Sequence, residues 1–114
     1  MPMKKSEQRD LFPGALEMMI LRTLKRQPLH GYALVQHIKR VSNDLLQIEE
    51  GSLYPALHRL EDRGWLSAEW RDTESGREAK FYALTAKGRK QLESEMLDWQ
   101  QLSNAVALIL KAAK

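Results

Sequence analysis

The chain has 114 residues, which is enough for one domain of moderate core size or for a small domain with one long helix appended. Its 43% hydrophobic and 29% charged residues are typical of a folded globular protein and exclude a largely disordered chain. A net charge of +3 permits a nucleic-acid partner without requiring one.

Two further absences narrow the class of protein. The sequence has no cysteine, which excludes disulfides, thiolate catalysis and thiolate metal ligands. No apolar run approaches the length of a membrane span, and the first residues lack the pattern of a signal peptide. We therefore expect a cytoplasmic protein without a membrane partner.

Two helices are predicted in the first third of the chain. Residues 1–10 are polar and charged and are expected to form a flexible arm. Helices are predicted over about 15–25 and over 32–41, separated by a break at 27–31 that contains a proline and a glycine. Their apolar faces are formed by Leu16, Met19, Ile20 and Leu24 in the first helix, and by Leu34, Val35, Ile38 and Val41 in the second.

A third helix is predicted over 52–63, and it has marked ends. Ser52 is expected to cap its first turn, Pro55 is tolerated if it lies in that turn, and Gly64 follows where a helix usually stops. One face is an apolar stripe that should be buried, whereas the other carries side chains suited to base edges and phosphates. The stripe is Leu53, Ala56, Leu57 and Leu60, and the opposite face is Tyr54, His58, Arg59 and Asp62.

After Gly64 the apolar period changes from that of a helix to that of a strand. Leu66, Ala68 and Trp70 alternate with polar residues, which predicts a half-buried strand. A polar loop over 72–78 leads to a second, aromatic-rich strand at 80–84. Three helices followed by a hairpin predict a mainly α fold with a small β-hairpin, the winged helix-turn-helix.

A long last helix is predicted from residue 86 toward 111, capped by Thr85 and weakened early by Gly88. At 1.5 Å per residue it is about 39 Å long, more than such a small domain can cover. Its apolar residues repeat every seven positions, which predicts a dimer seam. The seam consists of Leu92, Trp99 and Val106, with Met96 and Leu110 between them and Leu102 and Ile109 beside them.

The sequence offers no arrangement of residues for catalysis or metal binding. His30, His37 and His58 are scattered over separate elements and are expected to be surface or capping residues. The glycines occur singly, without a phosphate-binding loop, and Ser52 has no base placed beside it. We therefore expect a non-enzyme with no cofactor and no metal.

Three stretches of the chain, 28–34, 50–61 and 80–88, resemble in order the motifs of the PadR family of bacterial transcriptional regulators. The short C-terminal part is similar to the compact subgroup, in which one long helix and the N-terminal helix of the partner build the dimer. The resemblance implies a winged helix-turn-helix DNA-binding domain over 1–85 and a dimerisation helix over 86–114.

The resemblance implies a homodimeric repressor that binds an inverted-repeat operator in double-stranded DNA. The third helix would enter the major groove, and the wing would touch the backbone or the minor groove. Wings of the family often carry a basic run where this one has Glu74, Glu78 and Ala79. The implied DNA contacts are Gly31, Tyr32, Ser52, Tyr54, Pro55, His58, Arg59, Arg77 and Lys80, and the implied dimer contacts are Leu11, Phe12, Leu16, Leu92, Met96, Trp99, Leu102, Val106, Ile109 and Leu110.

Two questions stay open at this point. Trp99 lies where some similar proteins stack a small planar aromatic effector between the paired helices, but it also fits a plain dimer core. A winged helix can also serve as a protein-interaction module, in which case replacing Arg59 would leave its role intact. Non-specific architectural DNA binding is a third alternative, against which the modest net charge argues.

Overall fold

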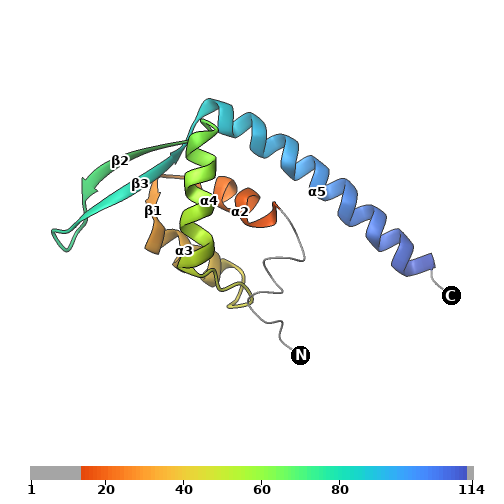
Figure 1. The fold of residues 1–114 in the computed structure, drawn as a ribbon. Helices are drawn as coiled ribbons and strands as arrows, with labels where there is room; N and C mark the ends of the chain where they lie inside the picture. Colours follow the sequence, from red (N-terminus) through yellow and green to blue (C-terminus); the bar gives the residue numbers. More distant parts are fainter. Residues whose placement is uncertain (1–13, 113–114) are drawn as a thin grey trace.

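The structure is a computed structural model that describes residues 14–112 of the chain (Figure 1). This part of the chain forms four helices and a small antiparallel sheet whose β-hairpin projects to one side of them, which confirms the mainly α, winged-helix prediction. The elements in order are α2 (Ala15–Leu24), β1 (Leu29–His30), α3 (Gly31–Val41), α4 (Glu50–Asp62), β2 (Leu66–Asp72), β3 (Glu78–Leu84) and α5 (Ala86–Ala112).

The core is built around the buried face of α4. Leu53, Ala56, Leu57 and Leu60 are all 0–1% exposed, as the apolar stripe predicts. They pack with α2, whose inner face is equally buried, with two residues of α3, and with single residues from β2, β3 and α5. Those partners are Ile20, Leu21, Leu24, Leu34, Ile38, Leu66, Tyr82 and Leu92.

The sheet has the strand order β1-β3-β2 and contains one strand that the sequence did not predict. β1 is only two residues long and falls in the break between the first two helices, so no alternation of apolar residues marks it. Leu29 pairs with Tyr82 and His30 pairs with Phe81. This short pairing ties the start of α3 to the base of the β2–β3 wing.

The start of α4 differs from the prediction. The helix begins at Glu50, two residues early, so Ser52 lies inside its first turn and is not the N-cap. The N-cap is Glu49, which makes no capping hydrogen bond with its side chain. Pro55 was expected in the first turn, but it is the sixth helical residue and therefore lies beyond that turn. Glu50 at the N-terminus suits the helix dipole, which favours the earlier start.

Two predicted core positions are exposed. Val41 at the end of α3 is 65% exposed and Trp70 in β2 is 66% exposed, although the periodicity placed both on buried faces. In each case the residue lies where its helix or strand extends beyond the rest of the domain, so that no other element covers the side chain. Only the first half of β2 has buried or half-buried positions.

α5 is fixed at its first turn and then leaves the domain (Figure 1). The Thr85 hydroxyl accepts a hydrogen bond from the Gly88 amide at 3.0 Å and donates one to the Gly64 carbonyl at 2.7 Å, which confirms Thr85 as the cap. Leu92 is 1% exposed within the core. Beyond it the helix projects outward, and the molecule measures 59 × 33 × 20 Å. No helix within residues 14–112 is both long and apolar enough to cross a bilayer.

Gly88 is required by the packing of α5, and the helix is continuous through it. A Cβ at this position would lie 2.1 Å from the carbonyl oxygen of Trp65 and 2.7 Å from a methyl carbon of Leu84. The first contact is with backbone, which cannot move aside without shifting the start of β2. The lack of a side chain therefore allows α5 to approach the α4–β2 junction.

We expect Gly88→Ala to lower the free energy of unfolding by about 2 kcal/mol or more, because overpacking outweighs the better helix propensity of alanine. The matched control is Gly51→Ala, also inside a helix but with no atom near the added Cβ. This control should be neutral or stabilising by up to about 1 kcal/mol. Urea denaturation of both variants measures the difference, and equal stabilities would contradict the packing argument.

Candidate functional site

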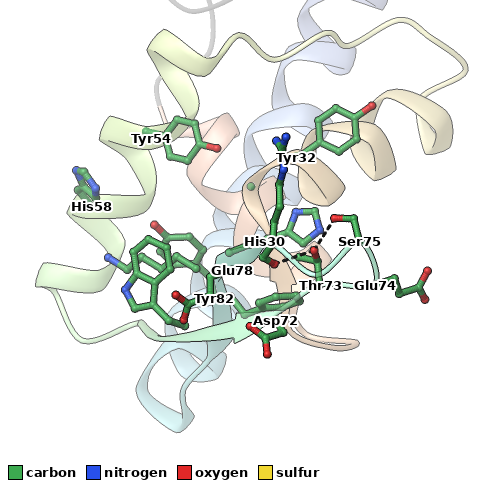
Figure 2. A pocket seen from close by; sticks show the side chains of 16 residues that line it. His30, Tyr32, Tyr54, His58, Asp72, Thr73, Glu74, Ser75, Glu78 and Tyr82 are labelled. Atoms are coloured by element: carbon green, nitrogen blue, oxygen red, sulfur yellow. Dashed lines mark hydrogen bonds between the residues drawn. The ribbon is translucent and has the colours of Figure 1, made fainter.

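An open groove of about 1100 Å³ lies between α4, the start of α3 and the β2–β3 wing (Figure 2). Its walls are rich in aromatic rings, and its rim at the wing tip is polar. The lining residues are His30, Gly31, Tyr32, Tyr54, His58, Trp70, Asp72, Thr73, Glu74, Ser75, Arg77, Glu78, Ala79, Lys80, Phe81 and Tyr82.

The groove wall at α4 is set by close packing of Tyr54 on Gly31. A Cβ placed on Gly31 would lie 2.7 Å from the Tyr54 hydroxyl oxygen and 3.0 Å from two of its ring carbons. His30 caps α3, and its Nδ1 accepts a hydrogen bond from the Ala33 amide at 3.2 Å. The absence of a side chain at residue 31 therefore lets the Tyr54 ring rest against the N-terminus of α3.

The structure brings most of the expected DNA contacts together, but not all of them. Gly31, Tyr32, Tyr54, His58, Arg77 and Lys80 line the groove. Pro55 is exposed on α4 outside the groove lining. The Ser52 hydroxyl oxygen is buried and has no hydrogen-bond partner among residues 14–112, and Arg59 is hydrogen-bonded to Glu17 of α2.

The groove gains little positive charge from its two cations. The ammonium group of Lys80 lies 3.1 Å from the Glu61 carboxylate of α4, and this hydrogen bond raises the pKa of Lys80 above its usual value. Arg77 has no ion pair with any carboxylate among residues 14–112. Three acidic side chains, Asp72, Glu74 and Glu78, share the same lining.

The wing tip is a tight turn stabilised by its own hydrogen bonds. The Thr73 amide donates to the Arg77 carbonyl at 2.7 Å, and the Thr73 hydroxyl donates to the same oxygen at 2.8 Å. Gly76 has a φ of 84°, in the left-handed region that favours glycine. The turn therefore holds Arg77 at the rim of the groove with a defined backbone.

Sequence reasoning missed several aromatic residues of the groove. Trp70 was predicted to face the core, yet it lines the groove and is exposed. His30 and Phe81 also line it, with their rings edge to face at a centroid distance of 5.1 Å. The only sequence signal was the density of aromatic residues in 80–84, which periodicity alone could not assign to a face.

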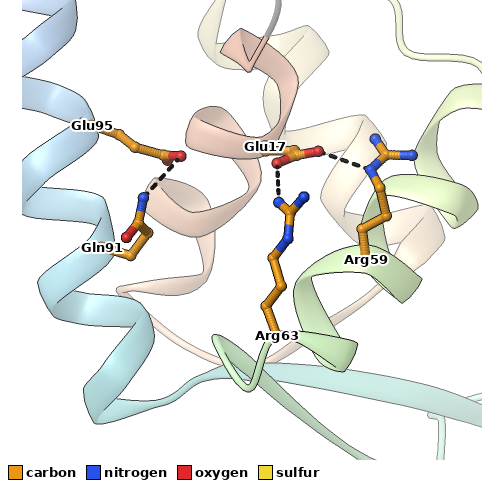
Figure 3. Close-up of polar contacts among 5 residues, drawn as sticks. All are labelled: Glu17, Arg59, Arg63, Gln91 and Glu95. Atoms are coloured by element: carbon orange, nitrogen blue, oxygen red, sulfur yellow. Dashed lines mark hydrogen bonds and ion pairs between the residues drawn. The ribbon is translucent and has the colours of Figure 1, made fainter.

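A second polar cluster lies on the other side of α4, where α2 packs between α4 and α5 (Figure 3). Arg59 and Arg63 both bond to Glu17, and Gln91 donates to Glu95 of α5 at 3.4 Å. The second carboxylate oxygen of Glu95 is buried and finds no hydrogen-bond partner in the described part of the chain. Burial chiefly raises the pKa of Glu95, and the nearby Glu17 adds to the shift.

The predicted dimer contacts fall into three groups. Leu11 and Phe12 lie outside the described residues. Leu16 packs half-buried against the core and Leu92 belongs to it, so within the described chain Leu92 anchors α5 to its own domain. The remaining six residues are 39–72% exposed along the projecting part of α5, namely Met96, Trp99, Leu102, Val106, Ile109 and Leu110.

Within residues 14–112, no three acidic or histidine side chains gather in a way that could hold a metal ion. His30 caps a helix, His37 hydrogen-bonds to Arg40, and His58 is exposed on α4. These placements agree with the expectation that each histidine is a capping or surface residue.

The raised pKa of Glu95 predicts how the stability of the folded protein changes with pH. Because the folded protein holds this proton more tightly than the unfolded chain, ionisation destabilises the fold, and stability falls as the pH rises from 4.5 through the folded pKa. Glu95→Gln should raise the melting temperature at pH 7 and flatten this part of the profile. The control is Glu93→Gln at an exposed neighbouring position, which should change neither the melting temperature nor its dependence on pH. If both variants show the same dependence of stability on pH, the effect cannot be assigned to Glu95.

Comparison with known proteins assigns the chain to a family. Residues 20–94 match the "Transcriptional regulator PadR-like family". The chain is 32% identical over 98 residues to "Transcriptional regulator Rv3488" of Mycobacterium tuberculosis, which covers 86% of this chain and 88% of the relative. It is 28% identical over 93 residues to "Negative transcriptional regulator PadR" of Bacillus subtilis, covering 80% of this chain and 50% of that protein.

A solved structure supports the same assignment. The PadR family transcriptional regulator from Eggerthella lenta superposes with a TM-score of 0.79 at 34% identity, covering 94% of this chain and 91% of the other. The shared fold extends over α5 as well as the winged helix. On these grounds the chain belongs to the PadR-like family of transcriptional regulators.

Proposed function

We propose that the protein is a homodimeric transcriptional repressor without enzymatic activity. In this proposal the outward face of α4 reads an inverted-repeat operator in the major groove, and the wing contacts the adjacent backbone or minor groove. Residues 1–85 would be the DNA-binding domain and 86–114 the dimerisation helix. The cytoplasmic location stays a prediction from the sequence.

The single observation that carries this proposal is the two-sided character of α4. One side is completely buried, which fixes the orientation of the helix, and the opposite side presents Tyr54 and His58 beside an open groove. A rigid helix with aromatic and hydrogen-bonding side chains on its outward face suits contact with base edges. Pro55 follows Tyr54 in α4, is also exposed, and adds an apolar surface that fits a thymine methyl group.

The wing has a smaller part in the proposal than the family pattern suggests. Lys80 is held by Glu61, and Arg77 shares the groove lining with three acidic side chains. Exposed Trp70 of β2 offers a flat apolar surface in the groove lining. We therefore assign most of the discrimination between sequences to α4.

Dimerisation through α5 is supported by the exposed apolar surface of its projecting part. Eight large apolar residues between 96 and 110 are 39–72% exposed, more than a monomeric protein usually leaves uncovered on one helix. Two copies packed along this surface would bury it and set the distance between the two recognition helices, which must be about 34 Å for half-sites one turn apart.

The same surface supports a proposal for regulation. A small planar aromatic effector could be held between the paired helices against Trp99, and a change in their separation would weaken operator binding. The alternative is that Trp99 only packs in the core of the dimer interface and binds no effector. Quenching of tryptophan fluorescence by a planar compound in wild type, but not in Trp99→Phe, would separate the two.

The DNA proposal is tested by titrating the protein against the duplex upstream of its own gene, with a scrambled duplex for comparison. Tyr54→Ala and His58→Ala should each lower the preference for the native duplex by about 1–3 kcal/mol, because they remove contacts to bases. Gln36→Ala, an exposed α3 residue outside the groove lining, is the control and should bind as wild type.

Unchanged preference in folded Tyr54→Ala and His58→Ala would contradict the role of α4. Equal binding of wild type to both duplexes would point instead to the protein-interaction alternative or to an operator elsewhere. Equal binding to all duplexes with a salt dependence set by phosphates alone would indicate architectural binding.

The dimer proposal predicts that Val106→Glu weakens self-association by at least about a hundredfold, because an unpaired charge buried in the seam costs several kcal/mol. Gln101→Glu adds the same charge on the opposite side of α5 and should remain dimeric. Sedimentation velocity measures both variants. A dimeric Val106→Glu would show that α5 is not the interface.

A further inference from the structure

The recognition helix α4 is joined to α2 by two arginines that share one carboxylate (Figure 3). Arg59 Nε lies 2.9 Å from Glu17 Oε1, and Arg63 Nη1 lies 3.1 Å from Glu17 Oε2. The two arginines are one helical turn apart, so the carboxylate accepts from successive turns of α4. Both of its oxygens are thereby engaged by the same helix.

The burial of this cluster distinguishes it from an ordinary surface ion pair. The Glu17 side chain is 15% exposed, whereas the side chains of Arg59 and Arg63 are 50% and 48% exposed. A carboxylate that is shielded from water and receives two charge-assisted hydrogen bonds is held more firmly than an exposed one. Arg63 also lies over the Trp65 ring, 5.2 Å from its centroid, which further limits its movement.

The position of Arg59 on α4 makes this contact relevant to DNA. In helical order Arg59 follows His58 directly, at the border between the outward face and the side that packs toward α2. Its Nε is occupied by Glu17, so in this structure the guanidinium is directed toward α2 and not into the groove. The sequence had suggested that Arg59 contacts DNA.

We propose that Glu17 is a positioning residue for operator recognition, acting through Arg59 and Arg63 to fix the rotation and register of α4. This inference rests on the proposed function of α4 as the DNA-reading helix. The buried apolar stripe of α4 determines which face points outward, but apolar packing is non-directional and leaves small rotations and slides of the helix undetermined. Two hydrogen bonds to one carboxylate define both coordinates and keep Tyr54 and His58 at a set angle to the operator.

The cluster also extends to α5. The carboxylate of Glu95 is close enough to Glu17 and Arg63 for both to influence its pKa, and α2 packs against α5. The helix that carries Glu17 therefore lies between the recognition helix and the base of the helix proposed to form the dimer.

A rival explanation predicts the opposite effect. If Arg59 is a DNA contact that Glu17 merely holds in the absence of DNA, Glu17 competes with the operator. Removing the Glu17 charge would then release Arg59 and tighten operator binding. In the positioning role, removing it loosens α4 and weakens discrimination between operator and scrambled duplex.

The experiment is a double-mutant cycle on operator preference with Glu17→Gln, Arg59→Gln and the double variant. Each is titrated against operator and scrambled duplex over a range of salt concentrations, well below the melting temperature of every variant. Glu93→Gln is the matched control, since it removes one negative charge from an exposed site and reports the general effect on DNA affinity.

We expect Glu17→Gln to reduce the operator preference about tenfold relative to Glu93→Gln, with the same salt slope as that control. Arg59→Gln should produce a similar loss, and the double variant should lose no more than either single one. If Glu17→Gln folds poorly, Glu17→Asp keeps the charge but shortens the arm, and it should show a partial loss of preference at normal salt dependence.

Three results would overturn the positioning role. The first is a Glu17→Gln variant with the preference of the control, and the second is tighter operator binding by it. The third is an Arg59→Gln variant that lowers the salt slope by about one, as expected for a lost phosphate contact. If wild type prefers the operator and Tyr54→Ala loses that preference, these results reject only the positioning role. A wild type without any preference rejects the proposed function and this inference together.

Discussion

The burial of one face of α4 is the constraint on which the rest of the structure depends. Four apolar side chains of this helix are fully buried, so the helix can present only its opposite face, and α2, the wing and the start of α5 all pack around it. Truncating one such leucine to alanine typically costs about 2–5 kcal/mol, a large part of the stability of a small domain. The orientation of the proposed reading face is therefore set by the core.

The distribution of charge follows a second rule, in that cations near α4 are held by carboxylates of the same domain. Glu17 binds Arg59 and Arg63, and Glu61 binds Lys80. The outward face of α4 and the adjoining groove are left with aromatic rings and few uncommitted positive charges. This arrangement accords with recognition by shape and base contacts and with less reliance on phosphate attraction.

Much of this architecture could be predicted from the sequence, because long helices with regular apolar spacing carry a strong signal. The helices, the hairpin, the helix stop at Gly64 and the cap of the last helix at Thr85 were confirmed. β1 was missed because a strand of two residues is too short to show an alternation of apolar and polar residues. Trp70 was predicted to be buried because alternation along β2 cannot show at which residue the strand extends beyond the rest of the domain. The roles of Arg59 and Gly88 depend on partners far along the chain, which no local pattern contains.

The most direct test of the central claim, that the outward face of α4 and its groove form the DNA surface, is hydroxyl-radical footprinting of the protein with and without operator duplex, read by mass spectrometry. Exposed Tyr32, Tyr54 and Trp70 provide reactive probes on the proposed surface, and exposed Val41 and Leu45, which lie outside the groove lining and outside α5, provide internal references. The account predicts strong protection of the three aromatic residues and none of the two references. Protection confined to α5, with unchanged reactivity at Tyr54 and Trp70, would contradict it.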